Sequence, residues 1–130
     1  MKYIPPFEMI IKSVDVSTSE GELMATVPYE ELIIMIKRLL CGVEVNEGWY
    51  LRQYPDVANA LKEGDVKSAK QHYIDHGYFE NRMPFPITVD EDWYVREYPD
   101  VASSIRDGVD TAQDHFVRQG YREGRMPSGS

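Results

Sequence analysis

The spacing of the hydrophobic positions changes along the chain near Pro28. Before this residue, the short runs Val14–Val16 and Leu23–Ala25 lie on either side of the polar stretch Ser17–Gly21. Short runs that flank polar turn residues favour a β-hairpin. The alternative is a flexible arm that becomes ordered only against a partner.

From Pro28 onward the pattern becomes helical. Proline is favoured in the first turn of a helix, and Glu30 and Glu31 follow where the helix dipole stabilises acidic side chains. Gly42 can end the helix after its last apolar position. The sequence therefore predicts a helix over Pro28–Gly42.

The apolar side chains of this helix extend beyond a single face. A helix that packs on one neighbour shows one apolar stripe, so this helix needs more than one apolar neighbour. Either it lies at the centre of a small core, or part of it forms a homodimer or partner interface. The second interpretation assigns the contact to Leu32, Ile33, Ile34, Met35 and Ile36.

The remainder of the chain is a segment of about forty residues that occurs twice, at residues 45–84 (repeat 1) and 89–127 (repeat 2). Each copy contains Trp-Tyr, Tyr-Pro-Asp-Val-Ala, Ala-x-x-His and a final Gly-Tyr-x-Glu-x-Arg-Met-Pro, in this order. Residues that keep their places in both copies are expected to serve the packing of the repeat first.

Each repeat is predicted to form three short helices. An N-cap side chain favours the start of the first and third helices. A proline ends the first helix, and the aspartate after it can restart the chain as the second helix. The predicted starts are Asn46, Asp56 and Ser68 in repeat 1, and Asp90, Asp100 and Thr111 in repeat 2.

The predicted fold class is therefore mainly α. It consists of two pseudo-symmetric three-helix repeats plus an N-terminal helix, with a short N-terminal β-hairpin as an option. Two repeats are fewer than a solenoid usually needs, so residues 1–44 or a second subunit should cap them. We expect residues 1–44, 45–84 and 89–127 to pack together as one domain.

Charge and composition narrow the classes of partner. A net charge of −8 and a pI near 4.8 argue against binding to nucleic acid, which requires clustered Lys and Arg. The longest apolar run, Leu32–Ile36, is too short to span a bilayer, and the N-terminus lacks the apolar core of a signal peptide. The single cysteine, Cys41, cannot form an internal disulfide. We expect a cytoplasmic protein without membrane insertion.

The repeat resembles a short bacterial repeat. The resemblance rests on Trp49-Tyr50, Tyr54–Ala58, His72-Tyr73 and Gly77–Pro84, together with the matching residues of repeat 2. Proteins with such repeats often are, or are encoded near, glycosyltransferases and surface-polysaccharide proteins, so the resemblance implies a context in envelope-polysaccharide metabolism. The first 44 residues lie outside it, and Asn81 replaces the glycine of the usual Glu-Gly-Arg.

Eight side chains of the repeats are candidates for binding a ligand such as a glycan. Aromatic faces stack on sugar rings, and charged groups can hydrogen-bond to hydroxyls. Alternatively, the aromatic residues fill the core and the charged residues fix the final turn. The candidates are Trp49, Tyr50, Glu80, Arg82, Trp93, Tyr94, Glu123 and Arg125.

His72, Asp75 and His76 have the spacing of metal ligands on one helical face. Repeat 2 keeps only the first of them, as His115, so a core histidine is the preferred interpretation. No nucleophile stands beside a histidine and an acid, and no glycine loop could cradle phosphate. We therefore expect no catalytic residue, no metal and no cofactor.

The sequence thus favours a non-catalytic, adaptor or regulatory protein-interaction module, with an unidentified protein partner and homodimerisation. The first alternative is a small carbohydrate-binding protein that uses the repeat aromatics. A metal-dependent or hydrolytic enzyme is a more distant alternative.

Overall fold

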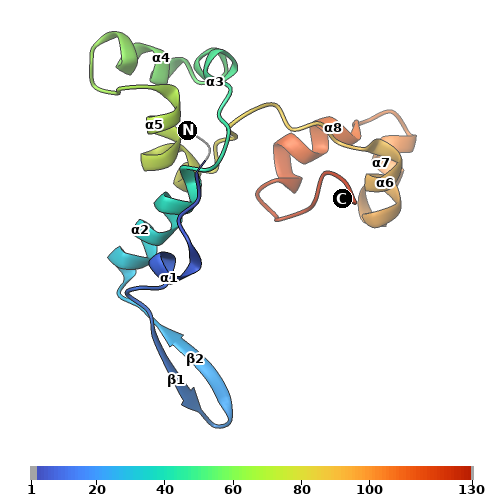
Figure 1. The fold of residues 1–130 in the computed structure, drawn as a ribbon. Coiled ribbons are helices and arrows are strands. Elements are labelled where there is room, and N and C mark those ends of the chain that lie inside the picture. The colour runs from blue at the N-terminus through green and yellow to red at the C-terminus, as the bar shows by residue number, and fades with distance from the viewer. Residues whose placement is uncertain (1–2, 130) are drawn as a thin grey trace. The chain divides into compact units, whose positions relative to one another are not determined.

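The computed structural model describes residues 3–129, and the chain divides into two compact units, Met1–Phe85 and Pro86–Ser130. Each unit contains one repeat (Figure 1). The fold is mainly α-helical with a short antiparallel hairpin near the N-terminus, which confirms the predicted fold class. The predicted packing of the repeats as one domain concerns the relation between the units and stays a prediction.

The hairpin consists of β1 (Asp15–Ser19) and β2 (Glu22–Thr26), joined by Glu20 and Gly21. Both turn residues have positive φ angles, 49° and 82°, which is the backbone geometry of the tight turn that suits twisted strands. A short helix that the sequence pattern did not indicate, α1 (Phe7–Ile10), precedes the hairpin.

The predicted N-terminal helix is α2 (Tyr29–Leu40), and its bounds lie within the predicted range. Its last residue, Leu40, is buried in the hydrophobic core of repeat 1, and Ile36 packs against the same core. The C-terminal part of α2 is therefore attached to repeat 1. The hairpin projects from the other end of α2, away from repeat 1 (Figure 1).

The two repeats have the same order of helices. Repeat 1 contains α3 (Glu47–Gln53), α4 (Pro55–Lys62), α5 (Ala69–His72), a π-helical turn η1 (Tyr73–Gly77) and a 3₁₀ turn η2 (Tyr78–Glu80). Repeat 2 contains α6 (Glu91–Glu97), α7 (Pro99–Arg106), α8 (Ala112–His115) and a π-helical turn η3 (Phe116–Gly120).

The predicted starts of the first and third helices are confirmed in both repeats, and the second helices begin one residue before the predicted Asp56 and Asp100. The side chains of Asn46 and Asp90 accept hydrogen bonds from the backbone N–H groups three residues later, at 3.0 and 3.2 Å. Ser68 and Thr111 cap the third helices in the same way, both at 3.0 Å. Pro55 and Pro99 occupy the first turns of α4 and α7.

Each repeat is built around one tyrosine with no exposed surface, Tyr50 in repeat 1 and Tyr94 in repeat 2. The three helices of a repeat surround this ring, with Val57 and Tyr73 among the buried residues of repeat 1, and Phe116 among those of repeat 2. The hydrophobic core therefore lies within each repeat.

Candidate functional site

An ion pair ties the end of each repeat back to its second helix. In repeat 1 the guanidinium of Arg82 contacts both carboxylate oxygens of Asp56, at 3.0 and 2.8 Å. In repeat 2 Arg125 contacts Asp100 in the same two-pronged way, at 3.0 and 2.7 Å. Such bidentate pairs fix orientation as well as charge. We call this contact the clasp.

A tyrosine lies beneath each clasp. The Arg82 guanidinium carbon is 4.8 Å from the centre of the Tyr54 ring, within cation–π range. The Tyr54 hydroxyl oxygen accepts a hydrogen bond from the backbone N–H of Met83 at 2.9 Å. Arg125 and Tyr98 repeat the stacking at 4.8 Å. The clasp therefore holds both an aromatic ring and the chain that follows it.

The clasp also changes proton affinities. The hydrogen bonds from Arg82 hold the pKa of Asp56 below its usual value, and the same pairing raises the pKa of Arg82. Arg125 lowers the pKa of Asp100 for the same reason. Both carboxylates therefore stay ionised near neutral pH and are poor candidates for a general acid.

A second contact joins the buried tyrosine of each repeat to its histidine. Tyr50 Oη lies 2.9 Å from His72 Nδ1, and Tyr94 Oη lies 2.7 Å from His115 Nδ1. Burial raises the pKa of both tyrosines and lowers the pKa of His72, which the charge of Arg82 lowers further. His115 is buried, as a core histidine should be, whereas His72 is only half-buried, and each contacts a tyrosine hydroxyl.

A glycine makes this contact possible. A Cβ atom added to Gly77 would lie 2.1 Å from Tyr50 Oη, and one added to Gly120 would lie 2.4 Å from Tyr94 Oη. Real Cβ atoms do not approach other atoms so closely. The glycine that begins the final motif of each repeat is therefore required by the tyrosine hydroxyl.

The predicted turn in the final motif is also present. Asn81 has a φ angle of 64° and Gly124 has one of 77°, so both occupy the left-handed region. The turn carries the chain back to the start of the repeat, where the Pro84 carbonyl accepts from the backbone N–H of Asn46 at 3.0 Å. Pro127 and Asp90 close repeat 2 at 2.9 Å.

The structure gives the predicted ligand-binding residues different environments. Tyr50 and Tyr94 have no exposed surface on which a sugar could stack. Trp49 and Trp93 are half-buried, each edge-to-face with the clasp tyrosine of its repeat. Arg82 and Arg125 form the clasps, and Glu80 and Glu123 lie 3.5 Å from them on the exposed side. The assignment of these eight residues to a ligand stays a prediction.

Sequence reasoning missed Asp56 and Asp100, which it treated only as residues that restart a helix. They are the partners of the two arginines. Their presence in both copies of Tyr-Pro-Asp-Val-Ala was the available signal, since an acid and an arginine retained together often form a pair.

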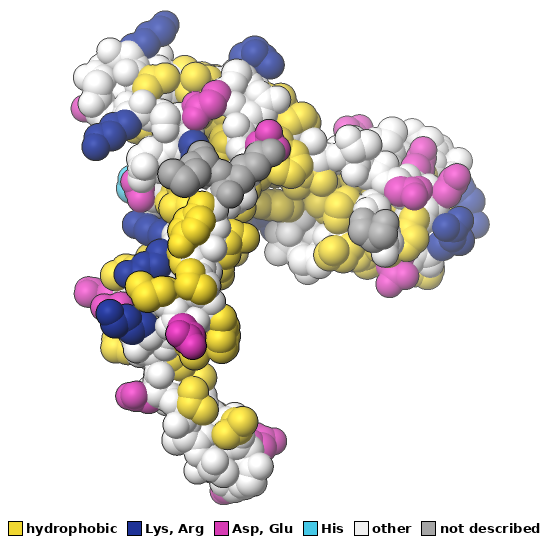
Figure 2. Space-filling model, viewed as in Figure 1, with side chains coloured by type: hydrophobic (Ala, Val, Ile, Leu, Met, Phe, Trp, Pro, Cys, Tyr) yellow, Lys and Arg dark blue, Asp and Glu magenta, His cyan; other side chains and the backbone are white. Residues whose placement is uncertain are grey.

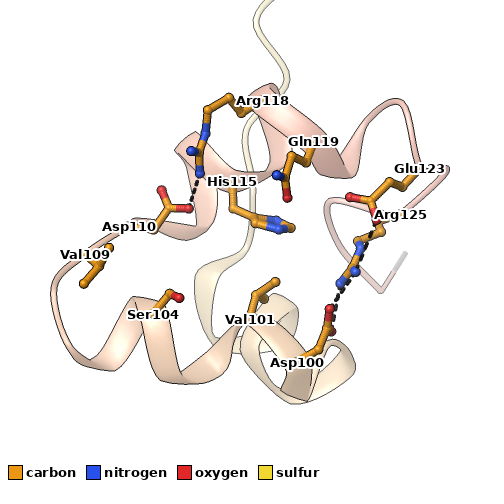
Figure 3. A pocket seen from close by; sticks show the side chains of 10 residues that line it. All are labelled: Asp100, Val101, Ser104, Val109, Asp110, His115, Arg118, Gln119, Glu123 and Arg125. Carbon is orange, nitrogen blue, oxygen red and sulfur yellow. Dashed lines mark hydrogen bonds and ion pairs between the residues drawn. The ribbon is translucent and has the colours of Figure 1, made fainter.

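A hollow lies between the second and third helices of repeat 2 (Figure 3). Its volume is about 470 Å³, and His115 lies at its centre, between the Arg118–Asp110 pair and the clasp. A smaller hollow of about 320 Å³ lies beside His72 in repeat 1. Charged and polar side chains line both hollows, so they suit a polar ligand better than an apolar one.

The two hollows carry reversed charges at equivalent positions. Lys67 and Asp75 line the hollow in repeat 1, where repeat 2 has Asp110 and Arg118. In repeat 2 these two residues pair with each other. In repeat 1, Asp75 instead contacts Lys37 of α2 at 3.6 Å. The reversal of charge therefore accompanies a change in ion-pair partner, from a residue of the same repeat in repeat 2 to a residue of α2 in repeat 1.

Among residues 3–129, no three His, Cys, Asp or Glu side chains are grouped so that they could hold a metal ion. His76 is exposed, and Asp75 accepts a hydrogen bond from Gln71 at 2.8 Å. No helix in this described range is both long enough and apolar enough to cross a membrane.

The N-terminal segment has a different surface from the repeats. Of the seventeen exposed large hydrophobic side chains in the described part of the chain, eleven lie between Tyr3 and Leu39. All ten strand residues of the hairpin are exposed. Within the predicted interface, Leu32 and Ile34 are exposed, whereas Ile33, Met35 and Ile36 are half-buried. Figure 2 shows hydrophobic side chains at this surface, interspersed with charges of both signs.

Comparisons with known proteins do not assign the chain to a family, because no family model, curated protein or solved structure matches it.

Proposed function

We propose that this chain is a non-catalytic protein-interaction module. The repeats form its scaffold and residues 3–40 form its contact surface. The observation that carries the proposal is the concentration of exposed apolar side chains on this segment, including Phe7 at 73%, Leu23 at 78% and Tyr29 at 75% exposed. Contiguous exposed apolar surface is characteristic of interaction sites.

The hairpin supports the same proposal. A two-stranded hairpin is marginally stable alone in water and usually needs a further strand or a packed face. In the register of β1 and β2, Val16 pairs with Ala25 and Thr18 pairs with Leu23, so these four side chains share one face. Since this face is exposed, contact with a partner would stabilise the hairpin.

The polar residues that the two repeats share support the proposal that the repeats form the scaffold. Their shared polar residues form the clasp and the tyrosine–histidine contact within the repeat. These residues therefore already have a structural role. Because the repeat resembles a short bacterial repeat associated with surface polysaccharides, we propose that the module is an adaptor or regulator in envelope-polysaccharide metabolism.

Carbohydrate binding is a second candidate, which the hollow of repeat 2 favours. Ser104, Gln119 and the Arg118–Asp110 pair line it with donors and acceptors suited to hydroxyl groups. Titration of the ¹⁵N-labelled chain with mono- and disaccharides tests this candidate. Saturable changes in the NMR chemical shifts of these residues would support carbohydrate binding, and unchanged spectra at high sugar concentration would contradict it.

The main proposal is tested by affinity capture from native lysate with matched charge variants. Val16→Lys/Leu23→Lys changes the exposed hairpin face, and Val109→Lys adds a charge to repeat 2 at a side chain that is more exposed than either of these. We expect the hairpin variant to lose a specific partner that the Val109 variant keeps. Equal capture by all three proteins would contradict the role of residues 3–40.

A further inference from the structure

Three side chains of α2 form an exposed line along the helix. Glu30, Ile34 and Arg38 are four residues apart, a spacing that places side chains above one another on one helical face. Glu30 and Arg38 are exposed, and Ile34 is 39% exposed. An isoleucine between two opposite charges thus faces outward.

The core contacts, hydrogen bond and ion pair described for α2 within its own unit are made by residues other than these three. Leu40 and Ile36 face the core of repeat 1. Glu31 accepts a hydrogen bond from Ser13, in the segment after α1, at 3.1 Å. The line is therefore a third face of the helix.

The line is complementary to itself under a two-fold rotation through Ile34. Two α2 helices that run antiparallel would place Glu30 of each opposite Arg38 of the other, with the two Ile34 side chains between them. A parallel arrangement would instead oppose like charges, which is unfavourable.

The helix dipole explains why acids begin α2 and bases end it. It does not explain why an isoleucine lies exposed midway between them on the same line. We infer that α2 pairs antiparallel with α2 of a second copy of this chain, with Ile34 at the two-fold axis. This inference rests on the proposed role of residues 3–40 and names their partner.

Antiparallel pairing also concerns the hairpin. A helix of twelve residues is about 18 Å long, and paired helix axes lie about 8–10 Å apart. The hairpin of each copy projects beyond the N-terminal end of α2 (Figure 1). It would therefore lie near the C-terminal end of the partner's α2, the end that is attached to repeat 1 of that copy.

Charge exchange tests the pairing. We expect the wild-type chain to have twice the 15.0 kDa mass of the single chain in light scattering. Ile34→Glu and the single changes Glu30→Arg and Arg38→Glu should each weaken dimerisation at least tenfold, with unchanged circular dichroism. The double variant Glu30→Arg/Arg38→Glu should regain most of it. A monomeric wild type, or a double variant no better than the singles, would overturn the inference.

Cysteine cross-linking tests the register in a Cys41→Ser background, which removes the exposed native thiol. Ile34→Cys should form a disulfide dimer under mild oxidation, because a two-fold axis brings this position close to its copy. Glu30→Cys and Arg38→Cys should cross-link rapidly only when mixed. Equal cross-linking by Leu39→Cys, on another exposed part of α2, would contradict the register.

The two experiments separate this inference from the proposed function. A monomeric chain that still captures a partner through residues 3–40 overturns the inference and keeps the function. A dimer restored by charge exchange, without any such captured partner, supports the inference and removes the adaptor role.

Discussion

Repeat 1 and repeat 2 are closed by the same contacts at nearly equal distances. The shorter clasp contact measures 2.8 Å in repeat 1 and 2.7 Å in repeat 2, and the tyrosine–histidine contact measures 2.9 and 2.7 Å. Two sequences that differ at many positions thus arrive at one arrangement. The shared residues are those that the fold of the repeat requires.

The differences between the repeats concern what each one contacts outside this arrangement. Repeat 1 receives the C-terminal part of α2. Its Glu47 accepts hydrogen bonds from the backbone at Ala69 and Lys70, at 2.8 and 3.0 Å. In repeat 2, Gln113 instead bonds to the backbone of Ile87 and Val89, at 2.7 and 3.0 Å. Any function that belongs to one repeat and not to the other should therefore involve these positions.

The strongest test of the comparison is at the glycines beside the buried tyrosines. Gly77→Ala and Gly120→Ala should each destabilise their own repeat by about 3 kcal/mol, because a fully buried ring cannot yield to the added methyl group. Each repeat contains one tryptophan, so urea unfolding of Trp93→Phe and Trp49→Phe backgrounds reports on each repeat separately.

Gly64→Ala is the control for this prediction. Its Cβ would have nothing within 4 Å, and the cost of its positive φ should be only about 1 kcal/mol. If Gly77→Ala cost no more than this control, the close approach of the tyrosine hydroxyl would not be the reason for the glycine.

The attachment of α2 should make the repeats respond differently to one change. Leu40→Ala should destabilise repeat 1 by about 2–3 kcal/mol, since it removes a buried side chain from the core, and should leave the unfolding of repeat 2 unchanged. The exposed neighbour Leu39→Ala should change stability by less than about 0.5 kcal/mol. An equal effect of both changes would show that α2 is not held through this core.

Replacing the clasp arginine by lysine should lower the stability of the two repeats by similar amounts. Arg82→Lys should cost repeat 1 about 1 kcal/mol, because lysine cannot form the bidentate contact or stack as arginine does. Arg125→Lys should produce a comparable loss in repeat 2. Arg96→Lys, at an exposed position in α6, serves as the control in the same urea titrations. A loss in one repeat alone would show that the clasps are not equivalent.

The smallest effect is a pH dependence in repeat 1. The folded state lowers the pKa of His72, so the unfolded state binds a proton first as pH falls below the ordinary histidine value of about 6.5. Stability should therefore be full above this pH and decrease as pH falls to the lower folded pKa. His72→Gln should flatten the profile of unfolding midpoints between about pH 7 and 5, whereas the change His76→Gln at an exposed position should not.

Much of the fold could be predicted from the sequence because its signals are local. Caps such as Asn46 and Ser68, and prolines such as Pro55, act on the next few residues, and the structure places helices where they indicate. α1 was not predicted, because four residues after two prolines give too short a pattern to distinguish a helical turn from an extended arm.

The candidate site could be predicted less well, because its contacts join distant residues. Arg82 and Asp56 are 26 positions apart, and no spacing rule connects a turn arginine to an acid at a helix start. Sequence also could not distinguish a buried ring from an exposed one, so Tyr50 and Trp49 seemed equivalent. Only the packing of three helices around Tyr50 separates them.

The hydrogen bond between Asn46 and Pro84 has an evolutionary consequence. Because Asn46 and Pro84, at the two ends of the repeat, lie side by side, the chain enters and leaves the repeat at one point. A duplicated segment inserted there would bring its own caps, glycine and clasp, which are the contacts that close a repeat. Duplication of this segment in tandem is thus structurally simple, and later substitutions can alter the surface residues that take no part in the closing contacts.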